Sequence, residues 1–144
     1  MTRVCIAGAT GWTGRAVAEA ALAAEDLEVT GAVARRAAGD DLGHVIGRKR
    51  ANIRISASVE EALEAAPADV LIDFTHPSVV KDHVKAALAR GTSVVVGTSG
   101  LTAEDYVELD GEARKAGKGV VASGNFAITA ALLSHFALIA AQHI

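Results

Sequence analysis

The stretch Val4-Cys5-Ile6-Ala7-Gly8-Ala9-Thr10-Gly11-Trp12-Thr13-Gly14 joins a short apolar run to a turn that contains three glycines. An alanine-rich segment, residues 13–24, follows and has the composition of a helix. In a strand–turn–helix unit, free backbone amides and the positive end of the helix dipole favour a pyrophosphate. Gly8 would permit the tight turn, Gly11 the approach of a phosphate, and Gly14 the packing of the helix on the strand. Such glycines also occur in purely structural turns, so their place after the first strand is what predicts a dinucleotide site.

Outward from this stretch, strands and helices alternate to the end of the chain. Apolar, β-branched runs predict further strands at residues 27–34, 53–55, 70–74, 93–96 and 120–122. Helices are expected at residues 58–66, 78–90, 102–116 and 128–142, whereas residues 39–52 are expected to form mostly loop. This alternation predicts an α/β fold, a doubly wound parallel sheet (Rossmann-like) of six or more strands with helices on both faces.

Local signals refine three of these elements. Residues 70–74, Val-Leu-Ile-Asp-Phe, lack a two-residue alternation, which is typical of a parallel strand buried on both faces. Residues 58–61, Ser-Val-Glu-Glu, predict a capping box, in which the hydroxyl and the carboxylate each satisfy a free amide at a helix start. Gly91 and Gly117 stand where a left-handed residue is expected after a helix.

The residues after the second strand indicate which cofactor the site takes. An NAD-preferring fold has a carboxylate there that binds the ribose hydroxyls, but this chain has Arg35-Arg36 and no acid before Asp40. Two guanidinium groups suit the 2′-phosphate of NADPH, because each can form bidentate, charge-assisted hydrogen bonds. We therefore expect NADPH as the cofactor, with NADH possible but weaker. The alternative is a solvent-exposed arginine pair on a loop.

Three further segments follow predicted strands, at the edge where open α/β sheets bind ligands. They are residues 73–77 (Asp-Phe-Thr-His-Pro), 97–100 (Gly-Thr-Ser-Gly) and 123–126 (Ser-Gly-Asn-Phe). Each one alone is compatible with an ordinary loop. Together with the glycine turn they predict a polar, glycine-rich rim along one edge of the sheet, which is typical of a nucleotide groove.

Composition limits the class of protein. The chain has 144 residues, of which 51% are hydrophobic, 22% charged and 3% aromatic, so one domain with an aliphatic core is expected. A net charge of −3 offers no general attraction for nucleic acid or acidic membranes. The single cysteine, Cys5, excludes a disulfide framework, and the apolar stretch 126–141 is short for a membrane span. We expect a cytoplasmic protein that binds neither nucleic acid nor membrane.

Other catalytic chemistries lack their residues in this chain. A Tyr-x-x-x-Lys pair is missing, because Tyr106 is followed four places later by Asp110. Cys5 lies inside the first strand, where a small buried thiol is the expected role and a nucleophile the alternative. The histidines show no metal-ligand spacing supported by acids, so no metal site is expected.

Over residues 1–144 the chain resembles the N-terminal half of the 4-hydroxy-tetrahydrodipicolinate reductases, also called dihydrodipicolinate reductases. The resemblance rests on residues 4–11 with Gly14-Arg15, on Asp73-Phe74-Thr75 with Pro77, on residues 97–100 and on Asn125-Phe126. It implies that the pyrophosphate and the adenosine ribose are contacted by Gly8, Ala9, Thr10, Gly11, Trp12, Thr13, Gly14, Arg35 and Arg36. It further implies contacts on the nicotinamide side from Phe74, Thr75, Gly97, Thr98, Ser99, Ser123, Gly124, Asn125 and Phe126. Thr10 and Trp12-Thr13 depart from the family's usual phosphate loop.

The resemblance also implies what residues 1–144 would not do alone. In this family, which serves lysine (diaminopimelate) biosynthesis, hydride passes from the nicotinamide to a cyclic unsaturated dicarboxylate held by a second, C-terminal domain. The family's histidine-rich acid segment and its substrate-binding Lys-x-Asp-Ala-Pro-Ser-Gly-Thr run have no counterpart before Ile144. We therefore expect a dinucleotide-binding domain over residues 1–144, without catalytic residues of its own. The alternative is a stand-alone NADP(H)-binding module without catalysis.

The last predicted helix, residues 128–142, is apolar nearly all round, unlike an ordinary surface helix. One side is expected to bury against the sheet, and the other to stay open. Because an exposed apolar patch on a domain usually binds a partner, we expect self-association of the chain through this helix, with fraying of its last turns as the alternative.

Overall fold

The computed structural model describes residues 1–143 and shows a six-stranded sheet in which all neighbouring strands are parallel. The strands are β1 (Thr2–Ala7), β2 (Leu27–Val33), β3 (Ile55–Ser56), β4 (Val70–Asp73), β5 (Ser93–Val96) and β6 (Val120–Ala122). The helices are α1 (Trp12–Ala23), α2 (Leu42–Val45), α3 (Val59–Ala65), α4 (Pro77–Ala89), α5 (Ala103–Ala116) and α6 (Ile128–Ala141), with a 3₁₀ turn, η1 (Arg35–Ala37). The strand order β3-β2-β1-β4-β5-β6 reverses between β1 and β4, which confirms the doubly wound fold expected from the sequence.

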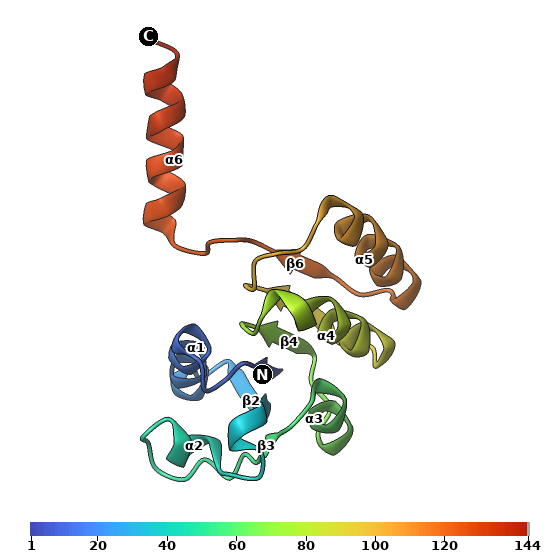
Figure 1. Cartoon of the computed structure of the whole chain (residues 1–144). Coiled ribbons are helices and arrows are strands. Elements are labelled where there is room, and N and C mark those ends of the chain that lie inside the picture. The colour runs from blue at the N-terminus through green and yellow to red at the C-terminus, as the bar shows by residue number, and fades with distance from the viewer. Residues whose placement is uncertain (144) are drawn as a thin grey trace.

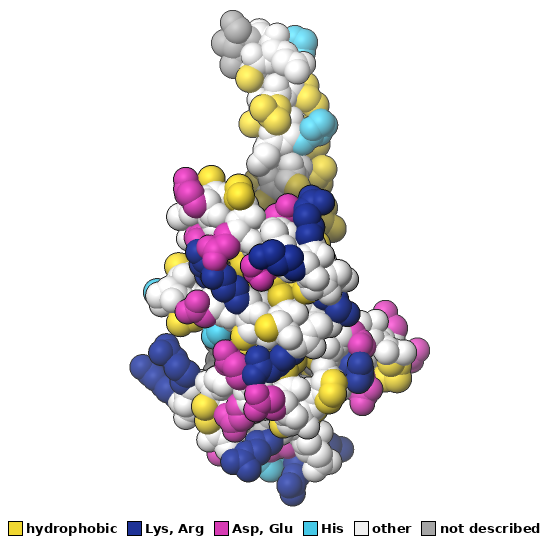
Figure 2. Space-filling model, turned by 90° about the vertical axis from the view of Figure 1, so that its right-hand side faces the viewer, with side chains coloured by type: hydrophobic (Ala, Val, Ile, Leu, Met, Phe, Trp, Pro, Cys, Tyr) yellow, Lys and Arg dark blue, Asp and Glu magenta, His cyan; other side chains and the backbone are white. Residues whose placement is uncertain are grey.

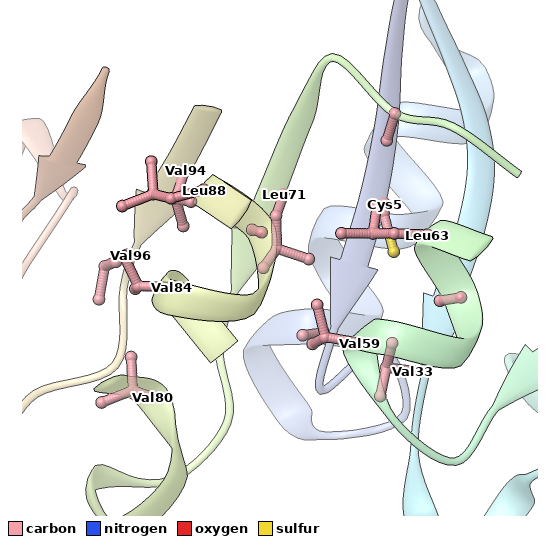
Figure 3. Packing of buried hydrophobic residues seen from close by; sticks show 14 of the residues in the cluster. Cys5, Val33, Val59, Leu63, Leu71, Val80, Val84, Leu88, Val94 and Val96 are labelled. Carbon is pink, nitrogen blue, oxygen red and sulfur yellow. The ribbon is translucent and has the colours of Figure 1, made fainter. Parts of the chain in front are cut away.

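Two apolar layers stabilise the sheet, one on each face. On one face α3, α4 and α5 pack over the strands through a cluster that includes Cys5, Leu71 and Val94 (Figure 3). On the other face α1 and the segment around α2 pack over β1, β2 and β3, with Ile6 and Leu42 fully buried. Helices therefore lie on both faces of the sheet, as expected (Figure 1).

The layer that contains α1 does not reach the β6 edge of the sheet. Along β4 and β5, buried and half-buried residues alternate, and the half-buried Ile72 and Val95 lie on the face opposite Leu71 and Val94. On that same face of β6, Val121 is 59% exposed. Val70 and Ile72 are half-buried at the margin of the α1 layer, so residues 70–74 are only partly covered on this face and the expectation that they are buried on both faces is wrong in degree.

The starts of α3 and α5 show how capping differs from the sequence pattern. Ser58 Oγ accepts a hydrogen bond from the Glu61 amide (3.2 Å), as predicted. The Glu61 carboxylate, however, accepts from the amide of the residue before Ser58, so the second half of the expected box is wrong. The complete capping box lies at α5, where Thr102 Oγ1 and the Asp105 carboxylate each accept from the other residue's amide. Aspartate at that position is a less common partner than glutamate, which makes this box hard to recognise in the sequence.

The segment of residues 39–52 is more ordered than a loop. It contains the one-turn helix α2, which begins after its N-cap residue Asp41, and the apolar Leu42 and Ile46 are buried on α2 and just after it. The expected loop is therefore wrong in its centre, because two apolar residues four apart are too weak a pattern to indicate a helix. The third strand is Ile55–Ser56, which lies later than the predicted 53–55.

Helix α6 stands away from the rest of the molecule (Figure 1). None of its residues is buried. Large apolar side chains are exposed along it, namely Ile128, Leu132, Leu133, Phe136, Leu138 and Ile139. Figure 2 shows the charged side chains on the body of the molecule and apolar ones on the projecting helix. The expectation that one side of this helix buries against the sheet is therefore wrong. Within residues 1–143, no helix has both the length and the apolar content that a membrane span requires.

Candidate nucleotide-binding cleft

A cleft of about 660 Å³ lies at the carboxyl ends of β1, β2 and β4, beside the point where the strand order reverses. The glycine turn, the arginine pair, the loop after β4, the residues before α3 and part of α4 form its walls. The predicted cofactor residues in its lining are Gly8, Thr10, Gly11, Arg35, Arg36, Phe74 and Thr75. The remaining lining residues are Val33, Ala34, Ala57, Ser58, His76, Val79 and His83.

In the glycine turn, backbone atoms pack directly against backbone atoms of the neighbouring segments. A Cβ atom on Gly8 would lie 2.2 Å from the carbonyl oxygen of Phe74, and the φ of Gly8 is 78°. A Cβ atom on Gly14 would lie 2.0 Å from the carbonyl oxygen of Gly8. A side chain at either position would therefore displace backbone. The turn, the start of α1 and the loop after β4 form a concave cradle that only glycine allows.

The N-terminus of α1 is left without a side-chain cap. Its N-cap residue, Gly11, has no side chain to donate or accept, and the first turn contains no acidic residue. The longer helices of the α/β body other than α1 are capped, α3 by Ser58, α4 by His76 and α5 by Thr102. The first amides of α1 therefore retain the positive potential of a helix start, next to Thr10 in the lining of the cleft. A phosphate group fits this position.

The arginine pair lies where the sequence predicted it, directly after β2. Arg35 and Arg36 form the 3₁₀ turn η1, are exposed and line the cleft. No carboxylate is among the described residues of the lining. This end of the cleft therefore carries positive charge without an opposing acid, which attracts an anionic ligand.

Phe74 connects the loops that follow β4, β5 and β6. A Cβ atom on Gly97 would lie 2.0 Å from Cε1 of the Phe74 ring, so the ring occupies the space that a side chain would take. The Phe126 ring meets Phe74 edge to face, with the ring centroids 6.4 Å apart and the planes at 66°. This geometry is typical of a favourable aromatic pair. The predicted residues Phe74, Gly97 and Phe126 are thus brought together, although only Phe74 lines the cleft.

A buried carboxylate, Asp73, ties the same loops together. It is fully buried at the end of β4. Its Oδ1 accepts hydrogen bonds from Thr98 Oγ1 (2.6 Å), Thr75 Oγ1 (2.8 Å) and the Thr75 amide (3.1 Å), while its Oδ2 lies 2.8 Å from Nδ1 of His83. Burial by itself raises the pKa of Asp73, but the hydrogen bonds from His83, Thr98 and Thr75 outweigh burial and hold the pKa below its ordinary value. Asp73 is therefore ionised near neutral pH and fixes three segments of the site.

Four predicted residues of the phosphate loop differ widely in exposure. Ala9 and Gly14 are buried beneath the turn, so they shape it rather than line it. Trp12 is 98% exposed at the start of α1, and Thr13 is exposed beside it. Their side chains lie outside the lining of the cleft.

The predicted residues after β5 and β6 also lie outside this lining. Thr98 belongs to the Asp73 network, and Ser99 is exposed next to it. After β6, Ser123 and Asn125 bond mainly to each other: Ser123 Oγ donates to the Asn125 carbonyl (2.9 Å) and accepts from the Asn125 amide (3.3 Å). Gly124 is exposed between them, and a Cβ atom on it would meet nothing within 4 Å among the described residues.

Sequence reasoning missed the contribution of α4 to the cleft. Val79 and His83 lie four residues apart on this helix and line the cleft together. The available signal was Asp73, a charged residue at the end of an apolar strand, because a buried carboxylate needs donors. Nothing local indicated that His83, ten positions later in the sequence, would supply one of them.

Cys5 behaves as the structural thiol that the sequence indicated. It is fully buried in β1, and burial raises the pKa of its thiol to about 12. A thiol with such a pKa is not a nucleophile near neutral pH. Within residues 1–143, no three His, Cys, Asp or Glu side chains are placed to hold a metal ion.

With this geometry established, comparison with known proteins decides the family. The family model described as "Dihydrodipicolinate reductase, N-terminus" matches residues 2–126. The chain belongs to this family. The 4-hydroxy-tetrahydrodipicolinate reductase of Thermosynechococcus vestitus is 40% identical over an alignment of 144 residues, which covers 97% of this chain and 52% of that protein. The resemblance seen in the sequence is thus confirmed, and the chain spans about half the length of the curated relatives it matches.

Solved structures agree with membership of the dihydrodipicolinate reductase family. The dipicolinate-bound dihydrodipicolinate reductase from Paenisporosarcina sp. TG-14 superposes with a TM-score of 0.82 and 27% identity, over 98% of this chain and 54% of that one. A biliverdin reductase from Synechocystis sp. PCC 6803, solved with biliverdin and NADP⁺, shares the fold at a TM-score of 0.68 and 21% identity, over 85% of this chain and 37% of that one. The Rossmann-like fold of this chain is therefore the one that holds a nucleotide in known oxidoreductases.

Proposed function

We propose that residues 1–144 form the NADP(H)-binding domain of a 4-hydroxy-tetrahydrodipicolinate reductase. The observation that carries the proposal is the cleft, where the uncapped start of α1, the glycine cradle and two arginines converge at the reversal of strand order. The pyrophosphate would bind at Gly8–Gly11 and the first amides of α1. Membership of the dihydrodipicolinate reductase N-terminus family supports this assignment.

We propose further that the domain prefers NADPH to NADH. Arg35 and Arg36 stand where an NAD-binding fold has its ribose-binding acid, and the described lining of the cleft holds no carboxylate to repel a 2′-phosphate. Two charge-assisted contacts to that phosphate would contribute on the order of 2–3 kcal/mol, or roughly 30- to 100-fold in affinity.

The nicotinamide end would lie along the loops after β4, β5 and β6. When bound, the cofactor supplies a hydride for reduction of a cyclic unsaturated dicarboxylate. In this chain, Phe74, Thr75, Gly97, Thr98, Ser99 and residues 123–126 would border the nicotinamide and its ribose. The Asp73 network fixes the first two of these loops, so the chain's own contribution is to bind and orient the cofactor.

Residues 1–144 are proposed to bind cofactor without reducing the substrate at a useful rate. Hydride transfer needs a substrate within about 3–3.5 Å of the nicotinamide and an acid that protonates the product. The substrate-binding and acid segments of the family are expected in a second domain, so the dicarboxylate would bind there and the reaction would serve lysine (diaminopimelate) biosynthesis. The expected cytoplasmic location stays a prediction.

Fluorescence titration with NADPH and NADH tests the cofactor proposal. The wild-type chain is expected to bind NADPH more tightly than NADH, and Arg35→Ala and Arg36→Ala are each expected to weaken NADPH binding while leaving NADH binding nearly unchanged. Arg50→Ala is the matched control, because Arg50 is exposed and lies outside this cleft. Equal affinity of the wild-type chain for both cofactors would contradict the preference, and absence of binding would contradict the function.

A stand-alone NADP(H)-binding module without catalysis is the second candidate, since the described cleft accounts for the binding of a dinucleotide and for nothing further. The intact mass of the protein from its native source separates the two. A mass near twice that of this chain supports the reductase, and a mass near 14.7 kDa supports the module. Oxidation of NADPH by residues 1–144 with substrate, at the rate of a full-length reductase, would contradict the module and the proposal that these residues do not reduce the substrate.

We also propose that the 144-residue chain self-associates through α6, with a second copy as the partner. Six large apolar side chains are exposed along this helix, and burying one leucine contributes roughly 1.5–3 kcal/mol. Leu133→Glu should therefore favour the monomer without loss of NADPH binding, as measured by sedimentation velocity. A wild-type chain that stays monomeric at high concentration contradicts self-association and leaves the rest of a longer chain as the occupant.

A further inference from the structure

We propose that His83 is a ligand-contacting residue of the cleft, whose Nε2 accepts a hydrogen bond from the adenosine half of the bound dinucleotide. Asp73 is then a positioning residue, because it holds the neutral imidazole in the tautomer with its hydrogen on Nδ1, in which Nε2 can accept this bond. The inference rests on the proposed function of the cleft and adds a contact that none of the sequence motifs indicates.

Asp73 decides which nitrogen of the His83 ring carries the proton. Nδ1 of His83 lies 2.8 Å from Oδ2 of Asp73, and Asp73 is fully buried. An ionised carboxylate only accepts hydrogen bonds, so Nδ1 must carry the hydrogen in this pair. In the neutral imidazole, Nε2 is then the unprotonated nitrogen and acts as an acceptor.

The other ring nitrogen of His83, Nε2, is accessible from the cleft. His83 lines the cleft, and its side chain is 18% exposed. Both hydrogen bonds of its ring within residues 1–143 are made by Nδ1, to Asp73 and, at 3.5 Å, to Thr75. Among the described residues, every buried side-chain nitrogen and oxygen has a hydrogen-bond partner. Nε2 of His83 has none there, so it is not buried and solvent reaches it. A group in the cleft can therefore bind it.

The neighbours of His83 in the cleft indicate which half of the dinucleotide it would contact. The cleft that His83 lines also contains Arg35, Arg36 and Ser58, which follow β2 and β3. In this fold the residues after the second strand meet the adenosine ribose. The loops after β5 and β6, on the opposite side of β4, lie outside the lining. The donors that the adenosine half of NADPH offers are the exocyclic amino group of adenine and the ribose 3′-hydroxyl, because the 2′-oxygen carries the phosphate.

Titration with NADPH and with its hypoxanthine analogue, which lacks the amino group, tests the contact. His83→Leu should weaken NADPH binding about five-fold, the loss expected for one hydrogen bond, whereas His83→Gln, which keeps an acceptor, should recover part of it. His44→Leu is the matched control, since His44 is exposed and outside this cleft. If adenine is the donor, the analogue binds wild type and His83→Leu equally. If a ribose hydroxyl is the donor, His83→Leu weakens both ligands alike.

The same titrations separate the proposed His83 contact from the proposed cofactor-binding function. Unchanged NADPH affinity in a folded His83→Leu variant overturns the inference and leaves the proposed function standing. Failure of the wild-type chain to bind any dinucleotide overturns the proposed function itself. Nitrogen-15 NMR of the imidazoles checks the role of Asp73 independently, because it should show the proton on Nδ1 of His83 in the wild-type chain. A proton on Nε2 instead would overturn the positioning role, whether or not an Asp73→Asn variant folds.

Discussion

The loop after β4 and the loop after β6 look alike in the sequence but differ in what orders them. Both are short, polar and contain an aromatic residue. The first is anchored by the buried Asp73, which bonds to residues of β5's loop and of α4. The second bonds mainly within itself, through Ser123 and Asn125, and leads into the exposed helix α6. The comparison teaches that the first loop is held by a buried carboxylate, whereas the second is held on the body by the contact of Phe126 with Phe74 and by the Ser123 amide, which donates to the Val96 carbonyl (3.1 Å).

The largest expected effect on stability comes from the loop after β4, which Asp73 anchors. Asp73→Ala removes the buried acceptor of four hydrogen bonds, which come from Thr75, Thr98 and His83, so it should lower the free energy of unfolding by roughly 3 kcal/mol. Asn125→Ala, which loses one hydrogen bond on an exposed loop, should change it by about 0.5 kcal/mol or less. Urea unfolding measures both, and equal effects would abolish the distinction between the loops.

The pH dependence of stability follows from the same carboxyl group. The folded-state pKa of Asp73 lies below its unfolded value, which is about 3.9. The ionised group therefore contributes stability above that value, and the contribution is lost as the pH falls through the folded-state pKa. We expect Asp73→Asn to lose less stability than wild type when urea unfolding is repeated between neutral and acidic pH. Parallel curves for the two proteins would show that Asp73 is not responsible.

A pair of glycine substitutions, with a somewhat smaller expected effect on stability, also compares the surroundings of the two loops. Gly97→Ala places a methyl group where the Phe74 ring lies, at 2.0 Å from its nearest atom, so the ring must move and stability should fall by about 1–3 kcal/mol. Gly124→Ala meets nothing within 4 Å and should be nearly neutral. Thermal unfolding followed by circular dichroism compares the two. A neutral Gly97→Ala would mean that Phe74 repacks freely.

A smaller effect on the free energy of unfolding is expected from a substitution at the start of α5. Thr102→Ala removes one side of the capping box of α5 and should cost about 1 kcal/mol. The control is Thr129→Ala near the start of α6, where no side-chain cap exists, and it should leave the free energy of unfolding unchanged. Urea unfolding of both variants provides the measurement.

The smallest effect is expected from removing α6 altogether. None of its residues is buried, so at a protein concentration too low for self-association a chain that ends at residue 127 should unfold at the same temperature as the full chain and bind NADPH equally well. The shorter chain keeps Phe126 and its contact with Phe74. Calorimetry and the fluorescence titration check this, and a fall in melting temperature would show that α6 packs on the body.

The arrangement of elements was largely predictable, because its signals are local. Apolar runs and helix ends repeat at the right spacing, and the glycines that end α4 and α5, Gly91 and Gly117, have the expected φ of 72° and 63°. Residues 39–52 show where this fails, since Leu42 and Ile46 are buried by neighbours that no local pattern reveals. The arginine pair was found because its place after β2 depends on chain order alone.

By itself, the sequence determined the doubly wound fold, the glycine turn before α1 and the positive charge after β2, because each depends on residues that are close together along the chain. Only the tertiary structure decided that Asp73 meets His83 and Thr98, that Phe74 fills the space over Gly97, and that α6 packs on nothing in residues 1–143. These contacts depend on how β4, β5 and α4 are placed side by side. That placement follows from burying the whole apolar layer at once, so no short stretch of sequence contains it.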